Sequence, residues 1–436
     1  MSIESNDVSV VIKSSCREMR DALQRREYDR FLALESAFYN QVVKVNETSA
    51  HYELCYAEFD PIGRVYGDVL TDSSQRVSHG NLARRVCYLL PNIDNDLAHI
   101  EFLYHVLKYH PPKSDLDITV AGYAQDASPC ASRFLSRLAS EGRISLAKIP
   151  DSHTGRIQFA RFFLDKVFSQ LIVFSIPLQL SAWVRALGPE LVTWVTTKFE
   201  LSAFDELRNR VSFSGVPGQV GSAVPVSAKD WLRSSAAISR ESVISYDRSR
   251  RRGNKLVTIN RSEKIRTHEF MTAVSSILIS EPSATFAWTG RSRDPIVQRF
   301  FEDVGVAPRC KFIGWVDPEV TLGQYDIFLD TFGLSGLVAT QAFCSGIPTV
   351  FFRNSRTWIE LHEDNLKTYP GLPIKGILAD SITDYENSVL DLIRDPAIYS
   401  ERSDAQRRFA DQFFYDEVGM YRSHIGIIRR LAQSAS

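Results

Sequence analysis

The sequence predicts an α/β protein with two consecutive domains, each built on a parallel sheet covered by helices, behind a small helical segment. Three observations support this prediction. The chain has 436 residues, which is more than a single hydrophobic core normally serves. Short apolar runs alternate with helical stretches in two separate series. A stretch rich in glycine, proline and serine separates the two series, as is typical of a connection between domains.

The first 80 residues show helical periodicity without a clear strand. Residues 15–26 and 28–45 carry apolar side chains at helical spacing, among them Leu32 and Phe38. The segment is too short for a solenoid, which needs about three repeats. We therefore expect a helical appendage over residues 1–80.

The first alternating series follows the appendage. Its strands are expected at residues 86–90, 117–121, 144–147, 171–174 and 191–194. Strands that alternate with helices pair in parallel, because each helix returns the chain to the same edge of the sheet. The series predicts a Rossmann-like domain over residues 81–245. Residues 212–245 are expected to form the long connection to the next domain.

The second series has the same rhythm. Its strands are expected at residues 256–259, 285–288, 311–313, 327–329 and 349–352, with helices at 267–280 and 338–344 and a helical region at 398–432. It predicts a second Rossmann-like domain over residues 246–436. Ligands of open α/β sheets bind beyond the carboxyl ends of the strands. Candidate residues are therefore those that directly follow a strand.

Charge and cysteine usage exclude some classes of protein. Lysine and arginine number 51 and aspartate and glutamate 52, giving a formal net charge of -1. Nucleic-acid binding draws its affinity from a basic excess, so we expect no nucleic acid partner. The six cysteines lie far apart without a CxxC pair, which indicates reduced, mostly buried thiols.

Targeting signals are not evident. Residues 1–20 lack the basic start and apolar run of a signal peptide. The most apolar window, residues 167–184, is interrupted by Gln170, Pro177 and Gln179, whereas a membrane span needs about 20 largely apolar residues. We expect a cytoplasmic protein without a transmembrane segment.

The first segment that can carry chemistry follows the strand at 256–259. Asn260, Arg261 and Lys264 occupy the loop and the first turn of the next helix. A lysine at a helix start, beside unpaired backbone N–H groups, can neutralise a diphosphate leaving group. The alternative is a surface loop with ordinary charges.

The second segment follows the strand at 327–329. Glycines let a phosphate approach the backbone, and the start of the next helix presents N–H donors to it. Gln341, on that helix, is placed to reach a ribose hydroxyl. The alternative is a tight connection without a ligand. The donor-binding candidates of this segment are Gly333, Ser335, Gly336, Leu337, Val338, Ala339, Thr340 and Gln341.

These segments resemble, in order, the motifs of the glycosyltransferase family that contains O-GlcNAc transferase and the bacterial cytoplasmic N-glucosyltransferases of adhesins. The resemblance extends over about residues 84–416. Asn260-Arg261 and Lys264-Ile265 resemble the family's Asn-Gln and Lys-Ile, in which the lysine contacts the donor diphosphate. Residues 329–331 resemble its Leu-Asp-Thr strand end, and residues 176–180 its Ala-Pro-x-Gln stretch.

The resemblance implies a GT-B fold, with residues 81–245 as the acceptor-side domain and residues 246–436 as the nucleotide-sugar-binding domain. It also implies an inverting, metal-independent transfer of a sugar from a UDP-sugar to a protein or glycan acceptor. Lys264 would stabilise the leaving diphosphate. His99 follows the first strand, where the family has a histidine-bearing loop, and is the first candidate for the general base. His153 and Gln179 are weaker acceptor-side candidates. We expect no cofactor.

Two sequence features could argue against a metal-independent, active transferase. Asp115-Leu116-Asp117 spells DxD, the metal signature of another class of glycosyltransferases, but it opens a strand instead of following one, so we expect no metal. Arg261 stands where the family has glutamine, and Gln341 where it has an acidic residue. The second departure favours an alternative, a catalytically inactive module that binds a partner glycosyltransferase or a glycan. A nucleotide-sugar epimerase is the other alternative, and it would need acidic residues beside the sugar.

Overall fold

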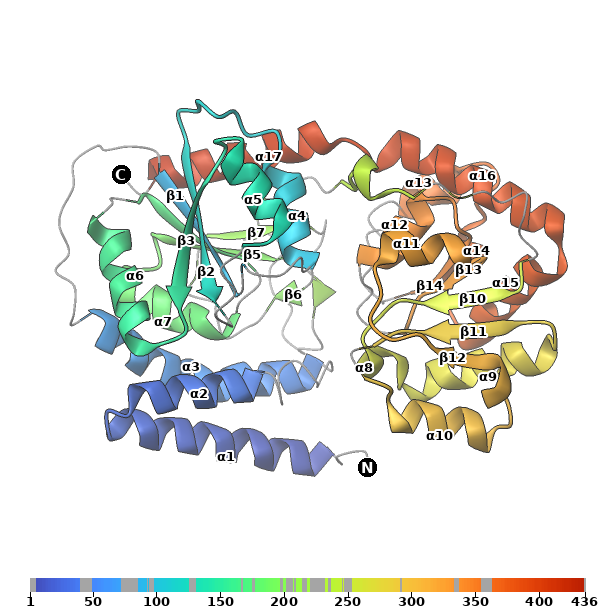
Figure 1. Cartoon of the computed structure of the whole chain (residues 1–436), viewed down its shortest axis with the longest axis horizontal. Coiled ribbons are helices and arrows are strands. Elements are labelled where there is room, and N and C mark those ends of the chain that lie inside the picture. Colours follow the sequence, from blue (N-terminus) through green and yellow to red (C-terminus); the bar gives the residue numbers. More distant parts are fainter. Residues whose placement is uncertain are drawn as a thin grey trace. The chain divides into compact units, whose positions relative to one another are not determined.

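The computed structural model divides into two compact units, Met1–Ser235 with Val418–Ser436 (the first unit) and Ala236–Glu417 (the second unit) (Figure 1). Each unit has its own parallel sheet. The domain boundaries expected from the sequence stay a prediction. The structure describes residues 5–39, 49–71, 85–91, 93, 98–124, 131–165, 168–174, 177–196, 199–200, 207, 209–213, 218–219, 232–233, 237–244, 246, 253–290, 292–332, 337–353 and 363–434.

The first unit contains a seven-stranded sheet with the order β3-β2-β1-β4-β5-β7-β9, and its strands pair in parallel. The five predicted strands are confirmed. The strands are β1 (Arg85–Leu90), β2 (Asp117–Ala124), β3 (Ser145–Pro150), β4 (Gln170–Phe174), β5 (Val192–Thr196), β7 (Arg210–Ser212) and β9 (Leu232–Arg233), and β6 (Phe199–Glu200) pairs separately with β8 (Gly218–Gln219).

The prediction that residues 212–245 form only a connection is wrong in part. Strand β9 lies within this stretch and extends the first sheet beside β7. Strands of two or three residues are too short to show an alternation of apolar and polar side chains, so the sequence pattern does not reveal them.

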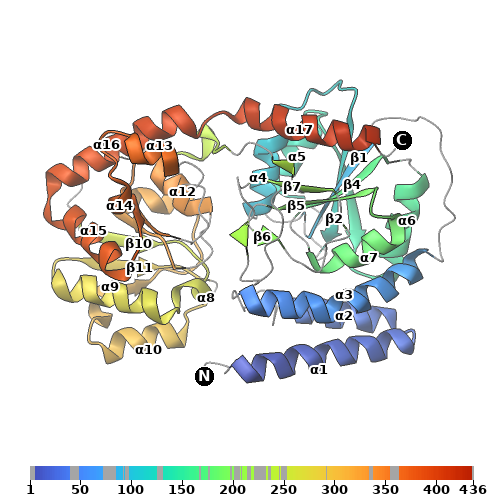
Figure 2. The same ribbon diagram turned by 180° about the vertical axis from the view of Figure 1, so that it is seen from behind.

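Helices cover both faces of the first sheet (Figure 2). On β1, Cys87 and Leu89 join the core formed with α3, α6 and α7, whereas the Tyr88 hydroxyl on the opposite face meets His424 of α17. Burial on both faces explains why the strands read as continuous apolar runs. The helices beside this sheet are α4 (Ala98–Leu107), α5 (Arg133–Ser140), α6 (His153–Asp165), α7 (Pro177–Leu187) and α17 (Glu417–Ser434).

The appendage consists of α1 (Ser5–Gln24), α2 (Tyr28–Phe38) and α3 (Ser49–Thr71) in the residues described. It shares one hydrophobic core with the first sheet instead of standing apart. Helix α3 approaches α7 closely because glycines face it: a Cβ on Gly63 would lie 2.9 Å from the Cβ of Ser181. A Cβ on Gly67 would lie 2.6 Å from the carbonyl oxygen of Ala182 and from the Cβ of Arg185.

We expect Gly67→Ala to lower the free energy of unfolding of the first unit. Alanine favours a helix over glycine by about 1 kcal/mol, but overpacking against a backbone carbonyl costs about 1–3 kcal/mol, so the net loss is about 1 kcal/mol. Gly426→Ala is the matched control, because nothing lies within 4 Å of the added Cβ on α17. Urea denaturation measures both variants. Equal stabilisation by the two alanines would contradict the close helix contact.

The second unit contains a six-stranded sheet with the order β12-β11-β10-β13-β14-β15, again paired in parallel. All five predicted strands are confirmed, and the two-residue β15 was not predicted. The strands are β10 (Lys255–Thr258), β11 (Thr285–Trp288), β12 (Cys310–Phe312), β13 (Ile327–Leu329), β14 (Thr349–Phe352) and β15 (Leu378–Ala379).

Helices flank the second sheet, and three of those described begin in the same way. Asp294, Asp317 and Asp395 each accept a hydrogen bond from a backbone N–H of the first turn, and a proline follows each of them, as is typical of a helix start. The helices are α8 (Ser262–Ile265), α9 (His268–Ser280), α10 (Pro295–Asp303), α11 (Pro318–Thr321), α12 (Leu337–Cys344), α13 (Glu363–Thr368), α14 (Ile374–Ile377), α15 (Ile382–Arg394) and α16 (Pro396–Phe413), with 3-10 turns at Arg240–Ser242, Ala307–Arg309 and Leu322–Gln324.

The strand order of each sheet reverses at one point. In the first sheet, β2 and β3 lie on one side of the β1–β4 pair, and β5, β7 and β9 lie on the other side. In the second sheet, β11 and β12 lie on one side of the β10–β13 pair, and β14 and β15 lie on the other side. Connections leave such a point on opposite faces of the sheet, which opens a crevice beyond the carboxyl ends of the two strands. Each unit thus has one place where a ligand site is expected.

Candidate functional site

The two segments singled out in the second half of the sequence meet at the reversal point of the second sheet. Strand β10 pairs directly with β13, with Leu256 opposite Ile327 and Val257 opposite Phe328. The loop that leads into α8, the short helix with Lys264, follows β10, and the loop with Asp330 and Thr331 follows β13. Segments about 70 residues apart in the chain therefore end at the same edge of the sheet. We call these two loops, with the start of α12, the switch-point site.

Side-chain hydrogen bonds fix the turn after β10. The Asn260 backbone N–H donates to Thr289 Oγ1 at 3.0 Å, and this hydroxyl donates to the Asn260 carbonyl at 2.9 Å. The Ser262 hydroxyl donates to the Ser292 carbonyl at 3.2 Å. A Cβ on Gly290 would lie 2.1 Å from Ser262 Oγ, so a side chain there would displace this hydroxyl. The turn that carries α8 is thus tied to the loop after β11.

Lys264 lies in α8 with only 6% of its surface exposed. Lysine is rarely buried to this extent, because removing its ammonium group from water is costly. A cation in such a place attracts an anion more strongly than one in open solvent, since the local dielectric constant is lower. Arg261, which precedes α8 in an extended conformation, is half-buried, and its carbonyl accepts the Lys264 N–H at 3.0 Å.

The end of β13 holds a buried hydroxyl, that of Thr331, which belongs to the Leu-Asp-Thr motif but was not among the predicted site residues. Asp330 and Thr331 are both fully buried. The Asp330 carbonyl accepts the Tyr385 hydroxyl at 2.8 Å, but Thr331 Oγ1 has no hydrogen-bond partner within the part of the chain that the structure describes. A buried polar group without a partner is unfavourable and uncommon in folded proteins. Thr331 Oγ1 is therefore suited to meet a ligand.

The start of α12 supplies the remaining candidates. Leu337 and Val338 are half-buried, and Ala339, Thr340 and Gln341 are buried. The carbonyl of Gln341 accepts both the N–H and the hydroxyl of Ser345, which turn the chain into β14. Gly333, Ser335 and Gly336 lie outside the described residues.

We expect Thr331→Val to leave the free energy of unfolding unchanged or slightly raised, because valine has the same shape and removes an unsatisfied hydroxyl. The same substitution is expected to weaken the binding of a nucleotide diphosphate by about fivefold to tenfold, which corresponds to the loss of one hydrogen bond. Thermal unfolding and titration calorimetry on the two proteins measure both effects. A large loss of stability would show that the hydroxyl has a structural partner.

A second residue was missed at the end of β12. Trp315 is 63% exposed, although it follows a strand whose side chains are partly buried. Its loop is tied to the loop after β11 by the Gly290 N–H, which donates to the Gly314 carbonyl at 3.3 Å. The ring is large and flat, and such a face can stack on a planar ligand. The signal in the sequence was an aromatic residue directly after an apolar run and a glycine.

In the first unit, two of the three predicted residues flank the reversal point. His99 lies in the first turn of α4, after β1, and Gln179 lies in the first turn of α7, after β4, and both are half-buried. Strands β1 and β4 are neighbours in the sheet. Gln179 Oε1 is buried without a partner among the described residues, as Thr331 Oγ1 is in the other unit.

His153 occupies a different environment. It follows the edge strand β3, and its ring stacks on Tyr28 of the appendage with 4.1 Å between centroids. Its Nδ1 meets the Tyr66 hydroxyl at 3.0 Å, and its backbone N–H donates to Asp29 at 3.0 Å. Burial lowers the pKa of this imidazole, which favours the neutral form. These contacts join α6 to the appendage, and its acceptor-side role stays a prediction.

The described residues contain no group of three or more histidine, cysteine, aspartate or glutamate side chains placed to hold a metal ion. The two aspartates of the DxD sequence lie near arginines: Asp115 is 2.6 Å from Arg429, and Asp117 is 3.5 Å from Arg85. Among the helices described, none is long and apolar enough to cross a membrane.

No protein-family model and no curated protein matches this chain. Solved structures do match. An O-GlcNAc transferase mutant of Thermobaculum terrenum matches with a TM-score of 0.65 and 16% identity over 98% of this chain and 83% of that one. The chain has the GT-B fold. The lipopolysaccharide outer core galactosyltransferase WaaB matches with a TM-score of 0.56 and 13% identity over 79% of this chain and 99% of that one.

A third GT-B structure, a TarM mutant of S. aureus in complex with UDP, matches with a TM-score of 0.55 and 8% identity over 79% of this chain and 99% of that one. The fold class predicted from the sequence is confirmed. At these identities the likeness concerns the fold, because one fold can serve many chemistries. The function has to be argued from the switch-point site.

Proposed function

We propose that this GT-B protein is a glycosyltransferase that moves a sugar from a UDP-sugar to a protein or glycan acceptor, with inversion and without a metal ion. The observation that carries the proposal is the buried Lys264 at the reversal point of the second sheet. The solved glycosyltransferases that share the fold, one of them holding UDP, support it.

The chemistry follows from where negative charge develops. As the acceptor attacks the anomeric carbon, the bond from that carbon to the β-phosphate oxygen breaks, and the diphosphate leaves with one additional negative charge. Lys264 and the backbone N–H groups at the start of α12 are the proposed stabilisers of that charge. They take the part that a divalent cation plays in metal-dependent transferases, which is why we include metal independence in the proposal.

The acceptor must lose a proton as its bond to the sugar forms. His99 is the proposed base, because an imidazole can take a proton near neutral pH and the residue lies beside the reversal point of the first sheet. Attack from the side opposite the departing diphosphate inverts the anomeric configuration. Trp315 is the proposed stacking partner of the uracil ring, since it is exposed after the edge strand β12 and its loop is tied to the loop after β11, the neighbour of β10.

Nucleotide binding tests the proposal. A ligand at 100 times its Kd adds about 2.7 kcal/mol to the free energy of unfolding, which thermal unfolding detects readily. Among UDP, GDP, dTDP and CMP we expect UDP to stabilise the protein most. The stabilisation by UDP should disappear in Lys264→Met. It should persist in Lys255→Met, because Lys255 is exposed at the opposite end of β10. Stabilisation by none of the four nucleotides would instead favour the catalytically inactive module.

A further inference from the structure

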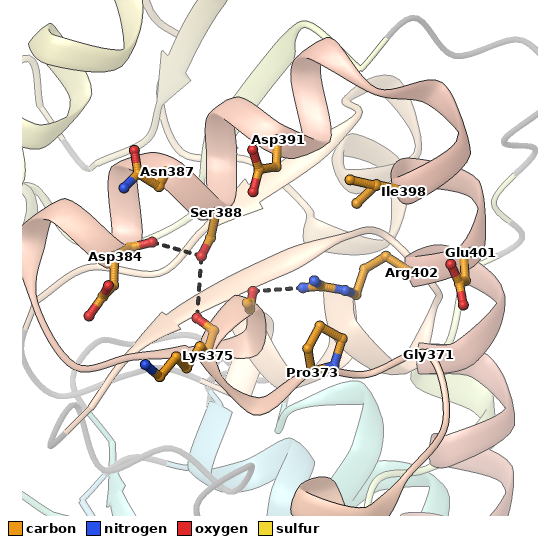
Figure 3. Close-up of a pocket in the computed structure, with 11 residues that line it drawn as sticks. Gly371, Pro373, Lys375, Asp384, Asn387, Ser388, Asp391, Ile398, Glu401 and Arg402 are labelled. Carbon is orange, nitrogen blue, oxygen red and sulfur yellow. Dashed lines mark hydrogen bonds between the residues drawn. The ribbon is translucent and has the colours of Figure 1, made fainter.

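The second unit has a pocket of about 510 Å³ that shares no residue with the switch-point site (Figure 3). Its walls come from the segment that precedes β15 and from α15 and α16. Small-molecule sites in proteins usually have volumes of about 300–1,000 Å³. The pocket is thus large enough for a ligand of its own.

A buried arginine forms one wall of this pocket. Arg402 is 5% exposed, and its Nη1 donates to the Gly376 carbonyl at 2.6 Å. Nε and Nη2 have no acceptor, and no carboxylate lies within ion-pair distance, among the residues described. Burial lowers the pKa of this guanidinium to about 10. A guanidinium offers five N–H donors, so those that the Gly376 carbonyl does not engage are available to a ligand in the pocket.

Glycines shape the loop around this arginine. A Cβ on Gly376 would lie 2.3 Å from Arg402 Nη2, so a side chain there would displace the guanidinium. Gly371 has a φ of 74°, which side chains rarely adopt, and a Cβ on it would lie 3.1 Å from Ala405 and 3.3 Å from Glu401. The loop therefore fits closely against α16, and the donors of Arg402 stay directed at the pocket (Figure 3).

Hydrogen-bond acceptors stand beside these donors. Asp391 on α15 and Glu401 on α16 line the pocket, and their charges act on Arg402 from beyond ion-pair distance. Asn387 adds an amide, which can both donate and accept. No hydrogen bond or ion pair engages these three side chains within the described parts of the chain. All three side chains are exposed to solvent, so the pocket places accessible acceptors beside the donors of Arg402.

The charges in the wall decide between ligand classes. Two cationic side chains, Lys375 and Arg402, face three carboxylates. A phosphate or nucleotide at Arg402 would be repelled by the carboxylates, and an amine would be repelled by the guanidinium. A hydroxyl group suits both, because it accepts from the guanidinium and donates to a carboxylate at the same time. Pro373 and Ile398 add apolar surface for the C–H faces of a ring.

We infer that this pocket binds a neutral saccharide, held by hydroxyl groups that bridge Arg402 to Asp391 and Glu401. The inference does not depend on the proposed transferase activity, because the residues of the two sites are different.

Titration of the full-length protein with maltose, lactose and chitobiose, followed by saturation-transfer NMR and calorimetry, tests the inference. We expect at least one of the three saccharides to bind. Asp391→Ala and Glu401→Ala should each weaken the binding of that saccharide about tenfold or more, the effect of losing a hydrogen bond to a charged group. Asp303→Ala, an exposed aspartate on α10, is the matched control and should leave the affinity unchanged. The stabilisation by UDP should persist in the two pocket variants, which separates this site from the proposed donor site.

Three results would overturn the inference. The first is the absence of binding by all three saccharides at millimolar concentration. The second is an unchanged saccharide affinity in both pocket variants, with their folds verified by thermal unfolding. The third is binding of inorganic pyrophosphate or spermidine in place of the sugars, with Asp391→Ala strengthening the binding of pyrophosphate or weakening that of spermidine, because a charged ligand would then be the occupant.

Discussion

Replacement of Lys264 with methionine is expected to lower kcat for sugar transfer by about 100-fold to 1,000-fold, the effect of removing one preorganised stabiliser of developing charge. Methionine keeps the length and apolar stem of the side chain, and the residue is 6% exposed, so the fold should accept it. The effect should fall mainly on kcat, because the charge on the leaving diphosphate is greatest in the transition state. Release of UDP from a UDP-sugar in the presence of acceptor measures the rate.

The control for this prediction is Lys255→Met on the same strand. Lys255 is exposed at the amino end of β10, whereas Lys264 follows its carboxyl end. A general effect of losing one positive charge would appear in both variants. A kcat for Lys264→Met close to that of the wild type would remove Lys264 from the mechanism.

The stability of the first unit is expected to fall by about 2 kcal/mol between pH 7.5 and pH 5 through His424 alone. This imidazole lies on α17 and is fully buried against β1, where its Nε2 meets the Tyr88 hydroxyl at 2.6 Å. Burial lowers its pKa to about 3. An unfolded chain binds a proton on histidine near pH 6.5 while the folded protein does not, so acid favours unfolding from pH 6.5 down to about 3.

Urea denaturation at pH 5 and pH 7.5 checks this prediction. His110 and His153 have pKa values lowered by burial and act in the same direction, so the comparison is between the wild type and His424→Gln. The variant should lose about 2 kcal/mol of the pH dependence. His268→Gln, at an exposed histidine on α9, should keep all of it. An unchanged pH dependence in His424→Gln would mean that the site is already protonated or open to water.

The sequence predicted the longer elements well, and the reason is burial on both faces of each sheet. Strands such as β1 and β10 are continuous apolar runs between polar loops, and these are visible without any structure. The two-residue strands β9 and β15 have no such pattern. Their pairing depends on neighbouring strands far away in the chain, which local periodicity does not encode.

The candidate site was only partly predictable for a similar reason. Lys264 and the start of α12 could be found because each directly follows an apolar run. That they meet at one reversal point is a property of strand order, which the sequence does not display. Thr331 was part of a quoted motif, but its place in the site was not predicted, because a hydroxyl without a partner is visible only once its surroundings are known. The pocket at Arg402 joins three segments that are separate in the sequence, so no local pattern displays it.

The central claim is that a nucleotide diphosphate binds at the reversal point of the second sheet. Hydrogen–deuterium exchange of the full-length protein, with and without saturating UDP, tests it most directly. Binding there should slow exchange in peptides covering residues 258–266 and 329–344, because the ligand would occupy their backbone N–H groups, and should leave peptides from 371–402 unchanged. UDP-dependent protection that leaves out both of the first two segments would contradict the claim.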